Sequence, residues 1–346
     1  MQCRLSLSGS VGGSDPVLRI VSIVLLNFVL FACNERTGER HTYLLTTGTT
    51  GGTFYPVGVA LSTLVSAQED SGFSISAISS AGSMENIRLM RDDQAQFAIL
   101  LGIFGAWAYE GSGPIRNPYK NFRSISAMWP NVEHFVLHSD LVQAGGIRDI
   151  NSLDGQRFSI GMRNSGAEYT GIYIFDALGI DYDNELSIAY MGYGPSANAL
   201  QDGNIVGMNI PAGPPVTAIT RAFALLGERM TILEFSEEDV RMMNHQFPLW
   251  ETYEITPGTY PAQEETINTA ASPNIFVARS DVSEEIVYSM TKMLWENLAT
   301  LQEIHGATRS MAIEIALRGV PVPLHPGALR YYQEQGVDIP AHLLGG

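Results

Sequence analysis

The sequence contains few cysteines and few lysines, and both shortages restrict what the protein can do. Only two of its 346 residues are cysteines, Cys3 and Cys33. Cys3 lies in a leader that we expect to be removed, so the remaining chain has no disulfide, no thiol nucleophile and no cysteine-based metal site. Lys120 and Lys292 are the only lysines. Since no basic patch or basic–aromatic run is present, the sequence argues against nucleic-acid binding.

The residue patterns of common enzymes are also missing. The seven histidines are scattered, no His-Glu-x-x-His spacing occurs, and no Gly-x-Ser-x-Gly nucleophile elbow is present. Glu85 and Glu168 fall in the first turns of expected helices, where the helix dipole favours a carboxylate whatever the function. We therefore predict a protein that is not an enzyme and has no cofactor or metal. An enzyme on the same architecture is the alternative.

The N-terminus has the pattern of an export signal. Ile20–Ala32 is an apolar run of thirteen residues, shorter than the roughly 20 residues of a membrane span and as long as the core of a signal peptide. The ending Leu30–Cys33 resembles a bacterial lipoprotein signal, in which the cysteine is acylated. We predict a signal peptide over 1–32, acylation of Cys33 and a tether over 33–42. Ordinary secretion and a retained membrane anchor are the alternatives.

The stretch Tyr43–Gly58 organises the rest of the chain. It reads as a strand, a turn of Gly and Thr, and a helix that continues to about Val65. The glycines let the backbone approach a ligand, and the helix begins with unpaired N–H groups and a positive dipole end. The turn therefore suits a carboxylate or phosphate. The glycine spacing fits neither a P-loop nor the dinucleotide fingerprint, and a turn without a ligand is the alternative. The candidate ligand-binding residues here are Thr47, Gly51, Gly52, Thr53 and Tyr55.

A second copy of this pattern follows at Arg157–Glu168, where a strand again runs into a Gly/Ser/Asn turn. The helix after it has apolar spacing and ends at Gly179. The units that follow each turn also correspond, so we expect two α/β halves that face each other across a cleft. The further candidate ligand-binding residues are Ser83, Met84 and Asn86 of the first half, and Arg163, Asn164, Ser165, Gly166, Ala167, Glu168, Tyr193, Asn209, Ala212 and Gly213 of the second.

Two of these residues allow alternative interpretations. Asn86 can equally form a side chain–backbone hydrogen bond. For Arg163 we predict a role in receiving the ligand's carboxylate, because a guanidinium offers a planar two-donor fork. An exposed Arg on the outer side of the turn, or one paired with Glu168, is the alternative. The net charge of −16 does not exclude an anionic ligand, since local dipoles and one Arg can outweigh a diffuse surface charge.

Four ordered motifs resemble those of TAXI-type solute-binding proteins, which serve tripartite ATP-independent periplasmic (TRAP) transporters. They are Thr47–Gly58, Gly82–Asn86, Thr256–Pro261 and His325–Ala328. The resemblance runs from about Tyr43 to Tyr332. It implies an α/β, two-lobed periplasmic-binding-protein fold of type II, with hinge strands and a ligand cleft between the lobes.

The resemblance also implies domain boundaries and a function. Lobe I would comprise 43–130 and 270–346, and lobe II 131–269. The protein would bind a small carboxylate, glutamate-like or a 2-oxoacid, by closing its cleft, and deliver it to the permease subunits of the transporter in the membrane. We expect it in the periplasm, held to a membrane only by the lipid on Cys33. A periplasmic sensor domain that reports to a signalling receptor is the alternative.

The chain departs from the family pattern after the strand Phe97–Leu101, where it is apolar and aromatic. Core packing is the commoner explanation of such aromatic side chains. If Ile103, Phe104 and Trp107 instead line the cleft, the ligand would carry an apolar portion beside its carboxylate. Further along, the apolar spacing predicts one long helix over Glu284–Ile304.

Overall fold

The computed structural model describes residues 41–68 and 72–345. The predicted signal peptide, Cys33 and most of the tether lie outside these residues. Within them, no helix is both long and apolar enough to cross a membrane.

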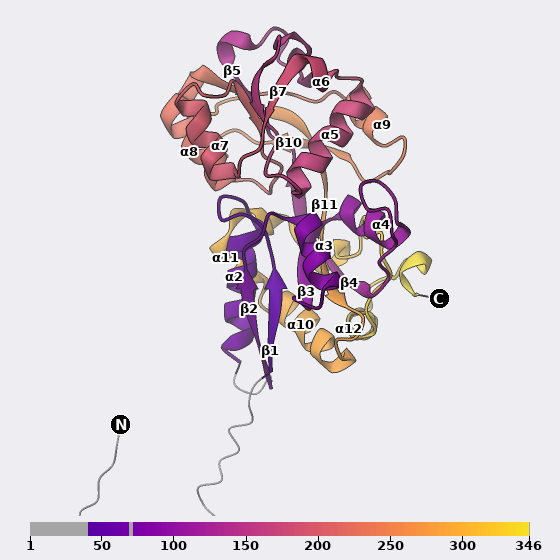
Figure 1. Ribbon diagram of the computed structural model, residues 1–346. Helices are drawn as coiled ribbons and strands as arrows, with labels where there is room; N and C mark the ends of the chain where they lie inside the picture. The colour runs from indigo at the N-terminus through magenta and orange to yellow at the C-terminus, as the bar shows by residue number, and fades with distance from the viewer. Residues whose placement is uncertain (1–40, 69–71, 346) are drawn as a thin grey trace, which may run out of the picture. The chain divides into compact units, whose positions relative to one another are not determined.

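Two β-sheets organise the described chain (Figure 1). The first has the strand order β10-β11-β3-β1-β2, and β4 also pairs with β11. The second has the order β7-β6-β8-β5-β9. The strands are β1 (His41–Thr46), β2 (Phe73–Ile78), β3 (Phe97–Leu101), β4 (Phe122–Val132), β5 (Phe135–His138), β6 (Gln156–Ser159), β7 (Leu186–Ala189), β8 (Gly207–Asn209), β9 (Met230–Ile232), β10 (Glu251–Ile255) and β11 (Ile267–Arg279).

The two sheets repeat one plan. In each, three strands run parallel with the first of them in the middle: β1 between β2 and β3, and β6 between β7 and β8. A strand from elsewhere in the chain then pairs antiparallel with the third, β11 with β3 and β5 with β8. The predicted pair of strand–turn–helix halves is therefore present.

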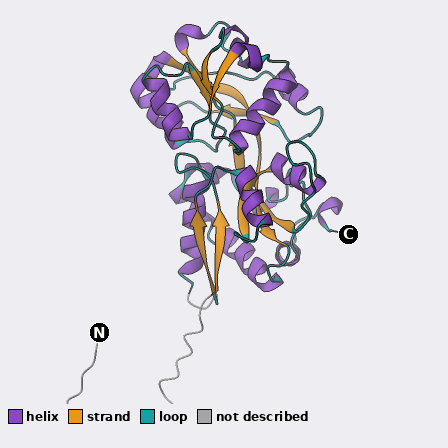
Figure 2. Cartoon of the chain, viewed as in Figure 1, coloured by secondary structure: helices purple, strands orange, loops and turns teal. Residues whose placement is uncertain are grey.

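Helices connect the parallel strands and cover the sheets (Figure 2). They are α2 (Phe54–Ser66), α3 (Ser83–Arg91), α4 (Gly102–Glu110), α5 (Gly166–Leu178), α6 (Tyr182–Glu185), α7 (Tyr193–Gln201), α8 (Thr217–Leu226), α9 (Glu237–Met243), α10 (Glu284–Glu296), α11 (Leu298–Ile304) and α12 (Pro326–Glu334). The helix predicted after the second turn is α5, and it ends as expected, because Gly179 adopts the left-handed conformation at its C-terminus.

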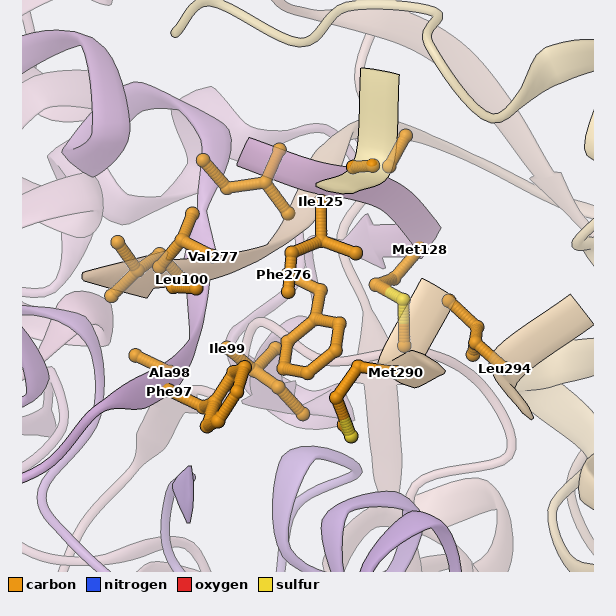
Figure 3. Close-up of a cluster of buried hydrophobic side chains, with 14 of the residues drawn as sticks. Phe97, Ala98, Ile99, Leu100, Ile125, Met128, Phe276, Val277, Met290 and Leu294 are labelled. Atoms are coloured by element: carbon orange, nitrogen blue, oxygen red, sulfur yellow. The ribbon is translucent and has the colours of Figure 1, made fainter. Parts of the chain in front are cut away.

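Each sheet has its own hydrophobic core. The core around the first sheet draws its buried residues from 45–129 and 275–343, and we call this part the first lobe. Figure 3 shows its centre, where Phe97 and Ile99 of β3 lie beside Phe276 of β11 and Met290 of α10. Two smaller cores surround the second sheet, with residues from 132–271, and we call this part the second lobe. Burying each large apolar side chain contributes about 1.5–3 kcal/mol.

Two strands pass from one lobe to the other. β4 and β11 pair antiparallel from Phe122 opposite Arg279 to Val132 opposite Ala271. Within this ladder Pro130 lies opposite Pro273, and the register shifts directly after that pair. Because neither proline has an N–H group to donate, the β4–β11 ladder has fewer hydrogen bonds where the two strands pass between the lobes.

The predicted long helix over Glu284–Ile304 is wrong in one respect, because it is divided into α10 and α11 at Asn297. The Asn297 side-chain amide donates to the carbonyl oxygen of Met293 at 2.9 Å. Asparagine competes in this way with helical backbone bonding, and apolar spacing alone does not reveal the break.

Candidate functional site

A cavity of about 40 Å³ lies between the two lobes, enough for a few water molecules or a small solute that displaces them. Its wall consists of residues at or after the carboxyl ends of strands in both sheets, together with Asn131 near the end of β4. They are Gly48, Thr49, Gly52, Thr53, Phe54, Ala81, Gly82, Ser83, Leu101, Asn131, Gly166, Ala167, Tyr193, Pro211 and Ala212. In α/β sheets this edge is where ligands bind.

The first lobe contributes two helix N-termini. α2 begins after the Gly/Thr turn with Thr53 as its N-cap residue, and α3 begins after Gly82. Neither N-cap residue forms a side-chain capping bond. The first N–H groups of both helices therefore have no capping side chain and can donate to a ligand.

The second lobe contributes two more. α5 begins at Gly166 and α7 at Tyr193, whose hydroxyl donates to the carbonyl oxygen of Pro211 at 2.8 Å. α7 likewise has no side-chain cap. Three uncapped N-termini, α2, α3 and α7, thus lie at one cavity, and their dipole ends favour negative charge there.

The lobes touch around the cavity. Thr53 Oγ1 of the first lobe donates to the carbonyl oxygen of Gly213 in the second at 2.7 Å. A Cβ atom on Gly166 would lie 3.0 Å from a Leu101 methyl group, and one on Gly52 would lie 3.1 Å from the Tyr193 ring. These glycines therefore permit the close approach that encloses the cavity.

No Lys, Arg or His is among the residues that line this cavity in the described part of the chain. An anion bound there would be held by backbone N–H groups and hydroxyls rather than by a cationic side chain. Nor do the residues 41–68 and 72–345 contain a group of three or more His, Cys, Asp or Glu side chains placed to hold a metal ion.

The sequence interpretation missed the most unusual polar side chain of the cavity wall, Asn131. It is fully buried, and neither atom of its side-chain amide has a hydrogen-bond partner in the described residues. Thr49 Oγ1, also in the wall, is buried without a partner as well. Such orphaned atoms are rare in native proteins and require an explanation. The available signal was an asparagine within the otherwise apolar stretch Ala127–Val132.

Glu133 follows Asn131 by two residues and is equally buried, and both of its carboxyl oxygens lack a partner in the described part of the chain. Burial raises the pKa of Glu133 to about 8, because the interior disfavours the charged form. Glu133 is not among the residues that line the cavity, but burial and then the Glu133 carboxylate raise the pKa of Tyr193, which does line it. At neutral pH Glu133 is mostly a neutral acid.

The structure places the eighteen predicted ligand-binding residues in three positions. Seven line the cavity: Gly52, Thr53, Ser83, Gly166, Ala167, Tyr193 and Ala212. Seven support its wall or the helices beside it: Thr47, Gly51, Asn86, Ser165, Glu168, Asn209 and Gly213. The other four, Tyr55, Met84, Arg163 and Asn164, are not part of the wall.

Asn86 is a framework residue. Its amide donates to the carbonyl oxygens of Thr47 and Ile99, and its carbonyl oxygen accepts from the hydroxyls of Thr46 and Ser80. The side chain of Asn86 therefore uses all of its hydrogen-bonding capacity within the protein. This agrees with the alternative interpretation of Asn86, in which its side chain bonds to the backbone. Ser83 is also bonded, because its hydroxyl oxygen accepts from the backbone N–H of Leu101 at 3.0 Å.

Arg163 does not face the cavity. It is exposed, and its guanidinium lies 3.7 Å from the ring centroid of Tyr190, a cation–π arrangement. Together with Met84 and Asn164 it lines a second cavity of about 660 Å³, whose wall includes residues of both lobes. A role of Arg163 in receiving the carboxylate stays a prediction. Asn164 is exposed beside Arg163 with φ of 57°.

Glu168 stabilises the N-terminus of α5. One of its carboxylate oxygens accepts from the backbone N–H of Asn164, and its own N–H donates to Ser165 Oγ at 3.1 Å. Burial raises the pKa of Glu168, opposed by the Asn164 hydrogen bond and by the positive charge of Arg163. This capping geometry accounts for the side chain without a ligand.

Of the two interpretations of Ile103, Phe104 and Trp107, core packing describes their positions. All three belong to the core of the first lobe, and none of them lines the cavity. Phe104 and Trp107 instead contact rings of the second lobe. The ring centroids of Phe104 and Tyr169 lie 6.2 Å apart, and those of Trp107 and Tyr173 lie 5.9 Å apart. Sequence spacing cannot distinguish a ring that faces a cleft from one that packs between lobes.

Comparison with known proteins gives a consistent result. The NMT1-like family matches residues 45–336. Among solved structures, MatC from Rhodopseudomonas palustris with bound malate is 12% identical, with a TM-score of 0.53, over 86% of this chain and 97% of that one. A protein from Bordetella bronchiseptica RB50 is 11% identical, with a TM-score of 0.50, over 88% and 91%. A protein from R. palustris with adipate is 17% identical, with a TM-score of 0.47, over 78% and 88%. The first two likenesses and the paired sheets confirm the two-lobed α/β fold predicted above.

Proposed function

Because the chain belongs to the NMT1-like family, we propose that it is the extracytoplasmic solute-binding subunit of a transporter. It would bind one small carboxylate between its lobes, close on it and deliver it unchanged to a membrane permease. The four sequence motifs support the more specific proposal of a TAXI-type subunit of a TRAP transporter.

One observation carries the proposal: three uncapped helix N-termini from both lobes lie at a cavity whose wall contains no cationic side chain in the described residues. N–H groups and dipole ends select negative charge. They offer no group with which to attack a bond. Binding without turnover is the activity that this geometry supports.

We propose lobe boundaries at 43–130 and 270–346 for one lobe and 131–269 for the other. In support, the first core ends at Trp129 and resumes at Ile275, and the other two cores extend from Val132 to Ala271, within a few residues of these boundaries. Opening would then bend the two crossing strands, and the weakened ladder at Pro130 and Pro273 suits a hinge.

We further propose that the protein works in the periplasm, anchored by acylated Cys33. The apolar run before Cys33 supports this proposal. Replacing Cys33 with Ser should release the protein from membranes or leave it unprocessed. A soluble wild-type protein whose N-terminus is not residue 33 would overturn the anchoring.

Calorimetric titration of the purified mature protein with small dicarboxylates and acidic amino acids tests the function, followed by mass spectrometry of the recovered solute. We expect one solute per chain, returned unchanged. Stoichiometric conversion of the solute would favour an enzyme.

A further inference from the structure

The cavity wall contains a polar group that the protein itself leaves unused. Asn131 is fully buried, yet neither its amide nitrogen nor its amide oxygen has a partner in the described residues. Asn86, also buried, forms four side-chain hydrogen bonds. The buried Asn209 and Asn274 each bond through the amide nitrogen, although their amide oxygens have no partner in the described residues. Asn131 differs because it lines the cavity between the lobes. A water molecule or a solute in the cavity can supply the missing partner.

The surroundings of Asn131 extend this polar region. Thr49 Oγ1 in the same wall is unpartnered, and so are both oxygens of Glu133, two residues further along the chain. The Val132 side chain between Asn131 and Glu133 is buried in the second lobe's core, as expected where side chains alternate in direction. The cavity wall therefore contains unused hydrogen-bonding atoms of Thr49 and Asn131 beside helix N-termini that only donate.

The chemistry of a primary amide defines the complementary solute. The Asn131 nitrogen donates two hydrogen atoms and its oxygen accepts. A carboxylate only accepts, so it can satisfy the nitrogen but not the oxygen. A hydroxyl or ammonium group on the carbon next to the carboxylate supplies the missing donor at the adjacent position. A 2-oxo group, which also only accepts, leaves the Asn131 oxygen unpaired.

From this geometry we infer that Asn131 is a specificity-determining residue, which selects carboxylates that carry a hydroxyl or amino group at carbon 2 over those that carry hydrogen or an oxo group there. The inference rests on the proposed function, because it concerns the solute of the same cavity. It narrows the solute from small carboxylates in general to 2-hydroxy and 2-amino acids.

Calorimetry with two matched pairs tests it: L-malate against succinate, and L-glutamate against glutarate. The members of each pair differ only in the donor at carbon 2. For wild-type protein we expect the donor-bearing member of at least one pair to bind roughly 10- to 100-fold more tightly, since an unpaired buried group penalises the other member. The pair that shows the preference identifies the donor as hydroxyl or ammonium.

Asn131→Leu should abolish this preference and, in the absence of solute, raise the melting temperature, because it removes orphaned polar atoms. Asn244→Leu is the matched control. Both amide atoms of Asn244 bond to the backbone of Trp250, at 2.7 and 2.9 Å. This control should lower the melting temperature and keep the preference.

Each other outcome decides against the inference in a different way. Equal binding within both pairs, or a preference that survives in Asn131→Leu, would overturn the role of Asn131 and leave carboxylate binding in place. Failure of wild-type protein to bind any of the four compounds would overturn the proposed carboxylate function together with the inference.

Discussion

The hydroxyl of Thr53 donates to the carbonyl oxygen of Gly213 at 2.7 Å, and this bond joins the two lobes at the edge of the cavity. Thr53 is also the N-cap residue of α2, although its hydroxyl does not cap that helix. The side chain that ordinarily satisfies a helix N-terminus is thus directed across the lobe boundary, and the N–H groups of α2 remain free for a solute.

Replacing Thr53 with Val tests this bond. Loss of one net hydrogen bond should weaken solute affinity by roughly 2- to 10-fold, because closure becomes less favourable. Calorimetric titration measures the change. Thr63→Val is the control, since the Thr63 hydroxyl donates to the carbonyl oxygen of Val59 within α2 and is exposed. Equal affinities for wild type and Thr53→Val would mean that the bond does not stabilise closure.

Stability should depend on pH through two neighbouring buried groups. Burial raises the pKa of Glu133 to about 8 and lowers the pKa of His134 to about 4. Above its unfolded pKa of about 4.3, the unfolded Glu133 loses its proton while the folded one keeps it. Glu133 therefore lowers the free energy of unfolding progressively as the pH rises to about 8. His134 stays neutral in the folded state. It lowers the free energy of unfolding only as the pH falls below about 6.5, where the unfolded His134 gains a proton and the folded one does not.

Between about pH 6.5 and 8, Glu133 is the only one of these two groups that changes the free energy of unfolding with pH. That free energy should fall by up to about 1.4 kcal/mol per pH unit. Denaturant unfolding across this range should show wild-type protein losing stability as pH rises, whereas Glu133→Gln should lose much less. A flat wild-type profile between these pH values would show that Glu133 is already ionised in the folded protein.

The aromatic contacts between the lobes should contribute to stability. Trp107 contacts Tyr173 and also Phe247, at 6.2 Å between ring centroids. Trp107→Ala should reduce the free energy of unfolding by about 3–5 kcal/mol, measured by chemical denaturation. Val59→Ala on the surface of α2 should cost less than about 0.5 kcal/mol. A loss of similar size in both variants would contradict the role given to the Trp107 ring.

Arg163→Ala distinguishes the structure from the sequence-based expectation. Since the guanidinium lies over Tyr190 and outside the cavity wall, affinity should stay within roughly twofold of wild type, as is usual for exposed side chains away from a site. Titration with the same solute measures it. A loss of roughly 2–5 kcal/mol, typical of unpairing a buried charge, would instead place Arg163 on the carboxylate.

Local sequence signals predicted the parts of the fold that depend on neighbouring residues. The turns after β1 and β6 have the glycines and helix starts that define strand–turn–helix units, and both are present as expected. The helix break at Asn297 was not predicted, because a single side chain–backbone bond decides it.

The site was harder to predict than the fold. Gly52 and Gly166 of the wall were identified because they stand in turns, but Asn131 lies in a strand, and its orphaned amide exists only once β4 passes between the lobes. The direction of Arg163 depends on Tyr190, which comes from a different strand–turn–helix unit. Such long-range placement is not encoded in residue spacing.

Blocking the cavity tests the central claim most directly, by calorimetric titration of Gly52→Val beside wild-type protein and Gly146→Val. A Cβ atom at Gly52 would lie 3.1 Å from the Tyr193 ring. Gly146→Val makes the same substitution away from the cavity wall, where a Cβ atom would lie 3.8 Å from its nearest neighbour. Overpacking costs about 1–3 kcal/mol, so Gly52→Val should bind the solute roughly 5- to 100-fold more weakly. Gly146→Val should match wild type. Unchanged affinity in Gly52→Val would show that the solute does not bind between the lobes.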